Sequence, residues 1–370
     1  MEIRRDQYLK QLVDYQWDGQ VKVITGIRRC GKSYLLRTLF KNYLLEQGVR
    51  EKQILSFELD LARDIQFRDP LVLSARVRET VEHAPEQYYL FVDEIQMSDT
   101  VPTPYNPHGA PITFYDALND LRSLPNLDVY VTGSNSKMLS KDILTQFRGR
   151  SDEVRVHPLS FSEFYSAVGG DKQEAFETYA FYGGMPLILS RPSDMAKMNY
   201  LKALFSEVFL KDIIERKRIE RYDVRGKSYF DFPNKYYCED IGLRNARIGF
   251  RQQEMTHMME NILYNELIVR GYSVDVGVVY SREKNKTGTQ TKVPREIDFI
   301  ASMGSKKVYL QSAYAMPSEE KIEAELKPFS LTGDSFPKVV VRKDIGKRWY
   351  NEKGILHIGL LDFLLDEAAI

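Results

Sequence analysis

The fold of this chain is decided by residues 21–45, which read VKVITGIRRCGKSYLLRTLFKNYLL. The first five residues are mainly apolar or β-branched, which is typical of a buried strand. Two glycines then bracket a polar loop, and apolar residues recur at helical spacing from Leu35 to Leu44. The stretch therefore predicts a strand, a loop and a helix in immediate succession.

The loop has the residue types that can hold a polyphosphate. Glycine lets the backbone turn so that successive N–H groups point inward, and a helix starting near Lys32 adds the positive end of its dipole. Lys32 would reach the β- and γ-phosphates, and the Ser33 hydroxyl would be a ligand of the Mg²⁺ that bridges them. Chance could produce the pattern GxxxxGKS, but the strand and helix around it are the setting that a P-loop needs. We therefore expect ATP and Mg²⁺ as cofactors, bound by Gly26, Ile27, Arg28, Arg29, Cys30, Gly31, Lys32, Ser33 and Tyr34.

A second motif supports a nucleotide site. Residues 88–94 read YYLFVDE, an apolar run that ends in two acids. Such a run is typical of a strand buried on both faces of a parallel sheet, whose carboxyl end opens at the ligand crevice. Asp93 would then hold Mg²⁺, and Glu94 would polarise the attacking water. A strand that ends in a solvated acidic turn is the alternative.

Polar and basic residues follow the next buried strand, which we predict at 127–132. Asn135 lies in the Gly-Ser-Asn-Ser segment after it and is the candidate sensor between water and γ-phosphate. Arg148 and Arg150 are candidate arginine fingers, acting in cis or supplied by a neighbouring subunit of a homo-oligomer. The alternative is a helix end whose basic residues favour the helix dipole.

Composition sets limits on location and partners. The 370 residues contain 52 basic and 52 acidic side chains, so any contact with nucleic acid must be a local patch. Two cysteines exclude a disulfide framework and suit a reducing compartment. The N-terminal residues lack the apolar core of a signal peptide, and no apolar run approaches the ~20 residues of a membrane span. We expect a cytoplasmic protein without a membrane segment.

Six blocks in order along the chain resemble a known family. The blocks are GIRRCGKS, YLFVDEIQ, VYVTGSNSKMLS, FRGR, PLSFSEF and YGGMP. Their succession resembles the AAA-related ATPases of the STAND type in archaea and bacteria. The resemblance implies an ATPase core at 1–158, a helical lid at 159–220 and a restriction-endonuclease-like domain at 221–370. Relatives usually carry a winged-helix unit before the last domain, and the short segment between Arg216 and Arg221 leaves no room for one.

The glycine pair in the predicted lid has two interpretations. In the resembling family the turn at 182–186 faces the nucleotide and couples its state to the next domain. A plain helix break explains the same residues equally well. The mixed charges of 211–227 indicate a solvated helix and linker rather than a nucleic-acid patch.

The last domain is expected to retain a nuclease-like fold without nuclease activity. The sequence predicts strands at 235–240, 272–280, 295–301 and 307–314, a helix at 252–270, and a Lys-rich loop at 281–292. The resemblance places Glu266, Asp298 and Gln311 on metal-site positions, and Ala313 where a lysine is expected. Lys321 is the nearest replacement cation in the sequence. Because a metal-dependent nuclease needs hard oxygen ligands and a cation, we expect no DNA cleavage.

These inferences leave two functions open. One is a nucleotide-gated switch, in which ATP hydrolysis drives or times a change in a C-terminal domain that binds a DNA or protein partner. The other is an ATP-driven machine that processes nucleic acid. Balanced charge and the missing winged helix favour the switch.

Overall fold

The computed structural model describes residues 3–103, 109–133, 147, 149–208, 218–224, 228–251, 254–284 and 290–370. The chain divides into two compact units, Met1–Pro158 and Leu159–Ile370. Each unit is described by itself. The finer division into a core, a lid at 159–220 and a last domain at 221–370 stays a prediction.

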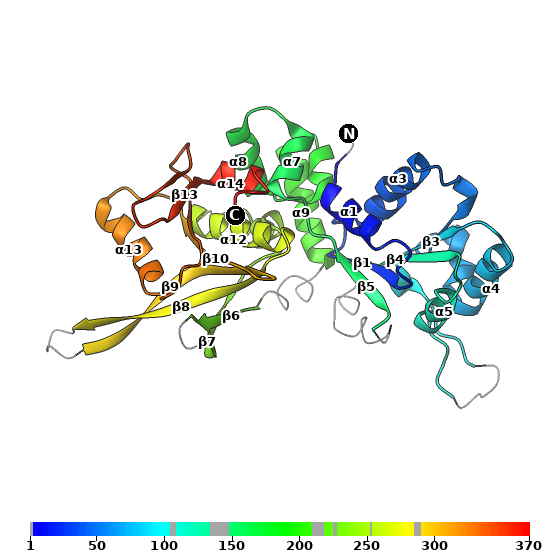
Figure 1. Cartoon of the computed structure of the whole chain (residues 1–370). Coiled ribbons are helices and arrows are strands. Elements are labelled where there is room, and N and C mark those ends of the chain that lie inside the picture. Colours follow the sequence, from blue (N-terminus) through cyan, green and yellow to red (C-terminus); the bar gives the residue numbers. More distant parts are fainter. Residues whose placement is uncertain are drawn as a thin grey trace. The chain divides into compact units, whose positions relative to one another are not determined.

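The first unit is built on a parallel sheet (Figure 1). Its strands pair in the order β2-β3-β4-β1-β5, and each neighbouring pair is parallel. Three of them, β1, β3 and β4, are buried along their whole length, as expected for the central strands of a sheet covered by helices on both faces. The predicted parallel α/β core is confirmed. The strands are β1 (Val21–Thr25), β2 (Ile54–Glu58), β3 (Tyr88–Asp93), β4 (Leu127–Thr132) and β5 (Ser151–Arg155).

Helices of the first unit begin where the sequence carries capping residues. Asp69 accepts hydrogen bonds from the N–H groups of Leu71 and Val72, and Thr113 forms a capping box with Asp116. The helix after the phosphate loop is continuous but changes to π-helical geometry over Leu35–Phe40. The described helices are α1 (Asp6–Asp14), α2 (Lys32–Tyr34), α3 (Lys41–Glu46), α4 (Pro70–Val81) and α5 (Phe114–Leu121).

A hydrophobic core fixes the positions of β1 and β3 in the first unit. Val23, Leu90 and Val92 are fully buried, together with Leu73 of α4 and Leu118 of α5. Each such side chain contributes roughly 1.5–3 kcal/mol through removal from water. The carboxyl ends of β1 and β3, which carry the two nucleotide motifs, are therefore held at one edge of the sheet.

The second unit begins with helices and continues into a mixed sheet. Ser160 and Asp171 cap the first two helices through their side-chain oxygens. Asp240 caps α11 by accepting the Leu243 N–H. The predicted strand at 235–240 therefore overlaps the observed strand β7, Ser228–Tyr236, only at its first two residues. The described helices are α7 (Phe161–Val168), α8 (Lys172–Tyr182), α9 (Asp194–Val208), α11 (Ile241–Arg247), α12 (Met255–Val269), α13 (Glu319–Ser330) and α14 (Leu360–Leu365).

The sheet of the second unit has eight strands in the order β12-β13-β11-β10-β9-β8-β6-β7. β10 is parallel to β11 and antiparallel to β9. The predicted loop at 281–292 is wrong at both ends, because β8 continues to Lys284 and β9 starts at Gln290. The strands are β6 (Arg218–Asp223), β7 (Ser228–Tyr236), β8 (Ser273–Lys284), β9 (Gln290–Met303), β10 (Lys306–Ala313), β11 (Lys338–Arg342), β12 (Trp349–Tyr350) and β13 (Leu356–Gly359).

The glycine pair after α8 lies at a point of close backbone approach. Gly183 has φ +74°, and a Cβ there would lie 2.4 Å from the carboxylate of Asp240. A Cβ on Gly184 would lie 2.2 Å from the carbonyl oxygen of Leu159. The Gly184 N–H donates to Asp240 at 2.7 Å. Within this unit the pair is explained by packing, because no side chain fits at either position.

Candidate nucleotide site

The phosphate loop between β1 and α2 depends on backbone conformations that glycine favours. Gly26 has φ +142°, and a Cβ there would lie 2.1 Å from the carbonyl oxygen of Val156. Gly31 has φ +106° at the residue before α2. Arg29 also lies in the left-handed region, at φ +66°. This succession of turns wraps the backbone around the start of α2, as the sequence predicted.

Lys32 lies inside this loop. Its side chain is buried, and its ammonium donates to the carbonyl oxygens of Gly26 at 3.1 Å and Ile27 at 3.0 Å. Burial of an ammonium is costly unless hydrogen bonds compensate it, so these carbonyls fix the cation in the concave side of the loop. Arg28 and Arg29 are exposed, whereas Cys30 is buried and its thiol donates to the Val156 carbonyl at 3.3 Å.

Ser33 and Asp93 come together although 60 residues separate them. The Ser33 hydroxyl donates to Asp93 Oδ1 at 3.0 Å, and the Thr132 hydroxyl at the end of β4 donates to the same oxygen. Asp93 is buried and accepts hydrogen bonds from both hydroxyl groups, which fix the orientation of its carboxylate. One hydroxyl and one carboxylate side by side are hard oxygen donors of the kind Mg²⁺ prefers, so these residues fit the predicted ion.

Glu94 follows Asp93 in an unusual backbone conformation. Its φ is +57°, and its N–H donates to Thr132 Oγ1 at 3.1 Å. The Gln96 amide donates to the Glu94 carboxylate. A non-glycine residue held at positive φ is uncommon and is found in functional turns. The bonds to Thr132 and Gln96 therefore fix the direction of this carboxylate.

Two arginines near these motifs were missed by reasoning from the sequence. Arg37, on the π-helical turn, pairs with Glu58 at the end of β2 and lies 3.6 Å from Asp93 Oδ2. Arg5, before α1, donates to the carbonyl oxygens of Cys30 at 3.2 Å and His157 at 2.7 Å. Neither arginine belongs to a recognisable motif. Only the spacing of four residues between Ser33 and Arg37, one helical turn, could have suggested that they share a face.

The remaining predicted site residues lie at the edge of the site or outside the described residues. The Tyr34 hydroxyl accepts the N–H of Ile3 at 3.3 Å. Arg150 is exposed just before β5, and its carbonyl accepts the Val21 N–H. Asn135 and Arg148 lie outside the described residues, so their predicted roles stay predictions.

A second cluster of charged residues lies in the second unit, around Lys235 at the end of β7. Its ammonium is 2.8 Å from Glu260 on α12, 2.5 Å from Glu296 on β9 and 3.9 Å from Asp298 on β9. The Tyr237 hydroxyl donates to Glu260. Asp298, which the resemblance places on a metal-site position, lies in this cluster, and the sequence analysis missed the lysine and the helix carboxylate beside it.

The other residues that the sequence analysis placed at the metal site of the second unit do not all lie near Asp298. Glu266 is buried and pairs with Arg270 at 2.8 Å, away from the Lys235 cluster. Gln311 does lie beside Asp298, since its carbonyl oxygen accepts the Asp298 N–H at 3.4 Å. Lys321 is half-exposed and pairs with Glu325, so it does not replace the missing lysine at Ala313. An ammonium does lie near Asp298, that of Lys235 at 3.9 Å.

Burial dominates the electrostatics of Asp298. Desolvation, together with the nearby negative charge of Glu260, raises its pKa to about 7 despite the attraction of Lys235. Desolvation and Glu260 also raise the pKa of Tyr237 far above its ordinary value. Within the described ranges, no three histidine, cysteine, aspartate or glutamate side chains are arranged to hold a metal ion.

The parallel sheet, the phosphate loop and the Ser33–Asp93 pair define a P-loop nucleotide-binding domain. Residues 18–165 match the family model described as "AAA domain". The match covers less than half of the chain, and it identifies this part as an AAA-related ATPase domain. No helix in the part of the chain that the structure describes is long and apolar enough to cross a membrane.

Relatives extend beyond this domain. An uncharacterized protein of Haemophilus influenzae is 28% identical over 433 aligned positions, which cover 98% of both chains. Since this chain has 370 residues, that relative contains residues with no counterpart here. An uncharacterized protein of Methanocaldococcus jannaschii is 27% identical over 217 residues, which cover 54% of this chain and 43% of that protein.

Two solved structures are similar to part of the chain. The Walker-type ATPase of Pyrococcus abyssi has a TM-score of 0.38 at 18% identity, over 56% of this chain and 74% of that one. DnaA of Aquifex aeolicus, solved with AMPPCP bound, has a TM-score of 0.33 at 14% identity, over 54% and 59%.

Proposed function

We propose that this protein binds Mg-ATP at the phosphate loop and hydrolyses it slowly, and that the hydrolysis cycle drives or times a change in the C-terminal part of the chain. One observation carries the proposal. The Ser33 hydroxyl lies 3.0 Å from the Asp93 carboxylate. The neighbouring Lys32 ammonium is buried in the phosphate loop that follows β1. Chance motif matches have no reason to meet at one edge of a sheet.

Lys32 would hold the phosphates as a point charge. Its two bonds to the loop carbonyls of Gly26 and Ile27 keep the ammonium where a β- or γ-phosphate oxygen would replace those carbonyls. Ser33 and Asp93 would hold Mg²⁺, which would supply charge neutralisation at the phosphates. The Thr132 hydroxyl positions the Asp93 carboxylate by donating to it.

Glu94 would orient the attacking water and accept its proton. The carboxylate is fixed by the Gln96 amide, and the backbone is fixed by the Thr132 hydroxyl. Such positioning contributes to catalysis because the base must be within hydrogen-bond reach of the water. Asn135 as γ-phosphate sensor, and Arg148 or Arg150 as a finger within the chain or across a homo-oligomer, complete the proposed site.

The second unit is the proposed responding part. We infer that residues 159–220 form a lid and that residues 221–370 form a restriction-endonuclease-like domain that binds a DNA or protein partner without cleaving DNA. The lack of cleavage cannot be explained by a missing cation, because the Lys235 ammonium lies 3.9 Å from Asp298. The reason that remains is that Lys235 already pairs with Glu260 and Glu296. The second candidate function is an ATP-driven machine that acts on nucleic acid. Cleavage of DNA by the cluster around Lys235 would favour it.

Two variants test the nucleotide site. Lys32→Ala should lose binding of a fluorescent ATP analogue, because it removes the cation that holds the phosphates. Glu94→Gln should bind the analogue with unchanged affinity and lose turnover by about 10²-fold or more, as expected for loss of a general base. Glu79→Gln, on the exposed face of α4, is the matched control and should match the wild-type protein in both assays. Turnover by Glu94→Gln at the wild-type rate would remove Glu94 from the mechanism.

A further inference from the structure

Strands β8 and β9 extend beyond the rest of their sheet as a two-stranded arm, which we define as residues 279–284 and 290–297. β6 pairs with β8 only from Val276 to Val278, and β10 pairs with β9 only from Phe299 to Met303. Among the described residues, the arm strands pair only with each other (Figure 1). A two-stranded ribbon of this kind is only marginally stable by itself in water.

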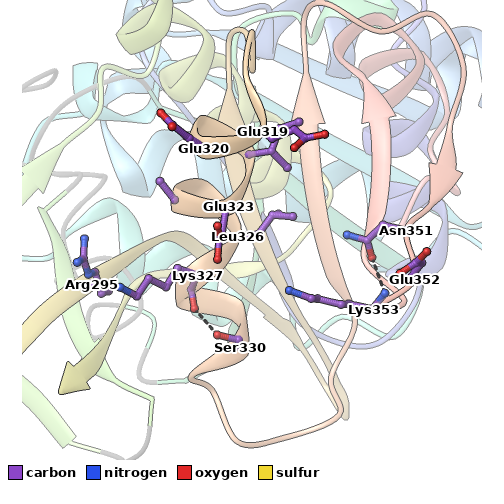
Figure 2. Close-up of a pocket in the computed structure, with 12 residues that line it drawn as sticks. Arg295, Glu319, Glu320, Glu323, Leu326, Lys327, Ser330, Asn351, Glu352 and Lys353 are labelled. Carbon is purple, nitrogen blue, oxygen red and sulfur yellow. Dashed lines mark hydrogen bonds between the residues drawn. The ribbon is translucent and has the colours of Figure 1, made fainter. Parts of the chain in front are cut away.

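One face of the arm is directed toward α13 and carries balanced charge. Glu283 on this face pairs with Arg295 at 2.5 Å and with Lys327 of α13 at 3.0 Å. These cations lower the pKa of Glu283 to about 2. Arg295 and Lys327 also line a groove of about 910 Å³ beside α13, together with acidic residues of that helix (Figure 2). The groove lining contains four glutamates and three cations, so this side has no excess of positive charge.

The opposite face carries cations without acidic partners. Arg282 and Lys292 are directly opposite each other in the antiparallel pair, so their side chains share this face. Both are exposed, and in the described part of the chain neither has an ion pair or a hydrogen bond from its side chain. Glu296, farther along the same face, is already paired with Lys235 at 2.5 Å.

This arrangement costs stability rather than adding to it. Like charges directly opposite in a ladder are destabilising, by up to roughly 1 kcal/mol. The ribbon has no further strand in the described residues to offset that cost. A pair of unopposed cations on a marginal ribbon is therefore better explained by an anionic ligand than by folding.

We propose that the Arg282–Lys292 face of the arm binds the phosphate backbone of double-stranded nucleic acid. A two-stranded ribbon has the width that the major groove of a B-form duplex accepts, and arginine and lysine are the side chains that contact phosphates. The chain as a whole has no net charge, so the cations of this face are a local feature. Single strands are instead held on exposed aromatic platforms, and the one aromatic residue among the described side chains of this face, Tyr280, is partly buried.

The test is a salt titration with the full chain, in the absence of nucleotide, using a short fluorescein-labelled duplex DNA and fluorescence anisotropy. The double variant Arg282→Gln/Lys292→Gln should bind more weakly. Since log affinity changes by about −0.9 per phosphate contact per decade of salt, losing two contacts should reduce the fall in affinity between 50 and 200 mM salt by roughly tenfold. Urea unfolding should show the double variant to be at least as stable as the wild-type protein, because it removes a like-charge pair.

Controls make the outcome decisive. Lys306→Gln, an exposed lysine at the start of β10 in the same unit, removes one positive charge away from the arm and should leave affinity and salt slope unchanged. Wild-type affinity and slope in the double variant, or an equal loss in Lys306→Gln, would overturn the proposal. Equal competition by the single strand would overturn the duplex assignment. Lys32→Ala should bind the duplex like the wild-type protein, so failure of the ATPase proposal and failure of this one are distinguishable.

Discussion

Replacement of Asp298 by asparagine should change how the stability of the second unit depends on pH. Asp298 is buried, and desolvation together with Glu260 raises its pKa from 3.8 to about 7. Between these two values the folded protein holds a proton that the unfolded chain has released. Stability therefore falls as pH rises through this range, until the carboxyl ionises in both states.

The size of the effect follows from the shift. Each pKa unit corresponds to about 1.4 kcal/mol, so the wild-type protein should lose about 2 kcal/mol between pH 5 and pH 7 through this group, and slightly more by pH 8. Asparagine does not titrate. Its carbonyl oxygen can still accept the Ser312 N–H that Asp298 Oδ2 accepts at 2.8 Å, and Lys235 keeps its pairs with Glu260 and Glu296. The variant should therefore gain about 3 kcal/mol relative to wild type on going from pH 5 to pH 8.

Urea unfolding at pH 5 and pH 8 measures this directly. In a Trp17→Phe background, fluorescence of Trp349 reports on the second unit, since the chain has two tryptophans. Asp344→Asn is the control, because Arg342 lowers the pKa of Asp344 and so moves its titration below this pH range. The control's difference from wild type should be the same at both pH values. If Asp298→Asn also differs from wild type by a constant amount, the carboxyl titrates normally and the reasoning fails.

Two further changes in the second unit test the packing. Gly184→Ala should lower the free energy of unfolding in urea by about 3 kcal/mol or more, because the new Cβ would lie 2.2 Å from a backbone carbonyl oxygen. Gly346→Ala is the control and should cost little, since no atom lies within 4 Å of its Cβ position. Equal losses in the two variants would contradict the packing explanation. His357 is fully buried against Trp349, its pKa is lowered by burial, and neither ring nitrogen has a hydrogen-bond partner among the described residues. Stability should therefore fall as pH drops through 6.5, and His357→Phe should remove that loss. An unchanged acid response in the variant would show that His357 titrates in the folded protein as it does in the unfolded chain.

The sequence predicted the nucleotide domain well because its signals are local. A β-branched strand, two glycines and a helix stripe are contiguous, and the acids follow an apolar run directly. Arg37 and Arg5 could not be found in this way, because their roles depend on contacts with Asp93 and with Cys30 and His157 that the fold creates.

The second unit was harder to predict because its cluster is assembled from separate strands and one helix. Glu266 and Glu260 are six residues apart on α12, so they lie on different faces of a helix with 3.6 residues per turn. Lys235 reaches Asp298 from β7, which β8 and β6 separate from β9 in the sheet order, so no periodicity in the sequence reveals the contact. Residues 281–284 and 290–292 of the arm were predicted as loop because they are polar on both faces, which removes the alternation that identifies a strand.

The contacts of Arg5 bear on how this protein can be shortened. The guanidinium lies between the phosphate loop, where it binds the carbonyl of Cys30, and residue 157, one position before the end of the first unit. A version that starts after Arg5 would remove a donor from two carbonyl groups, at a cost of roughly 1–3 kcal/mol for each that stays buried and unsatisfied. The loop would then be less firmly anchored to the strand end beside it, so a shortened ATPase domain should keep the residues before α1.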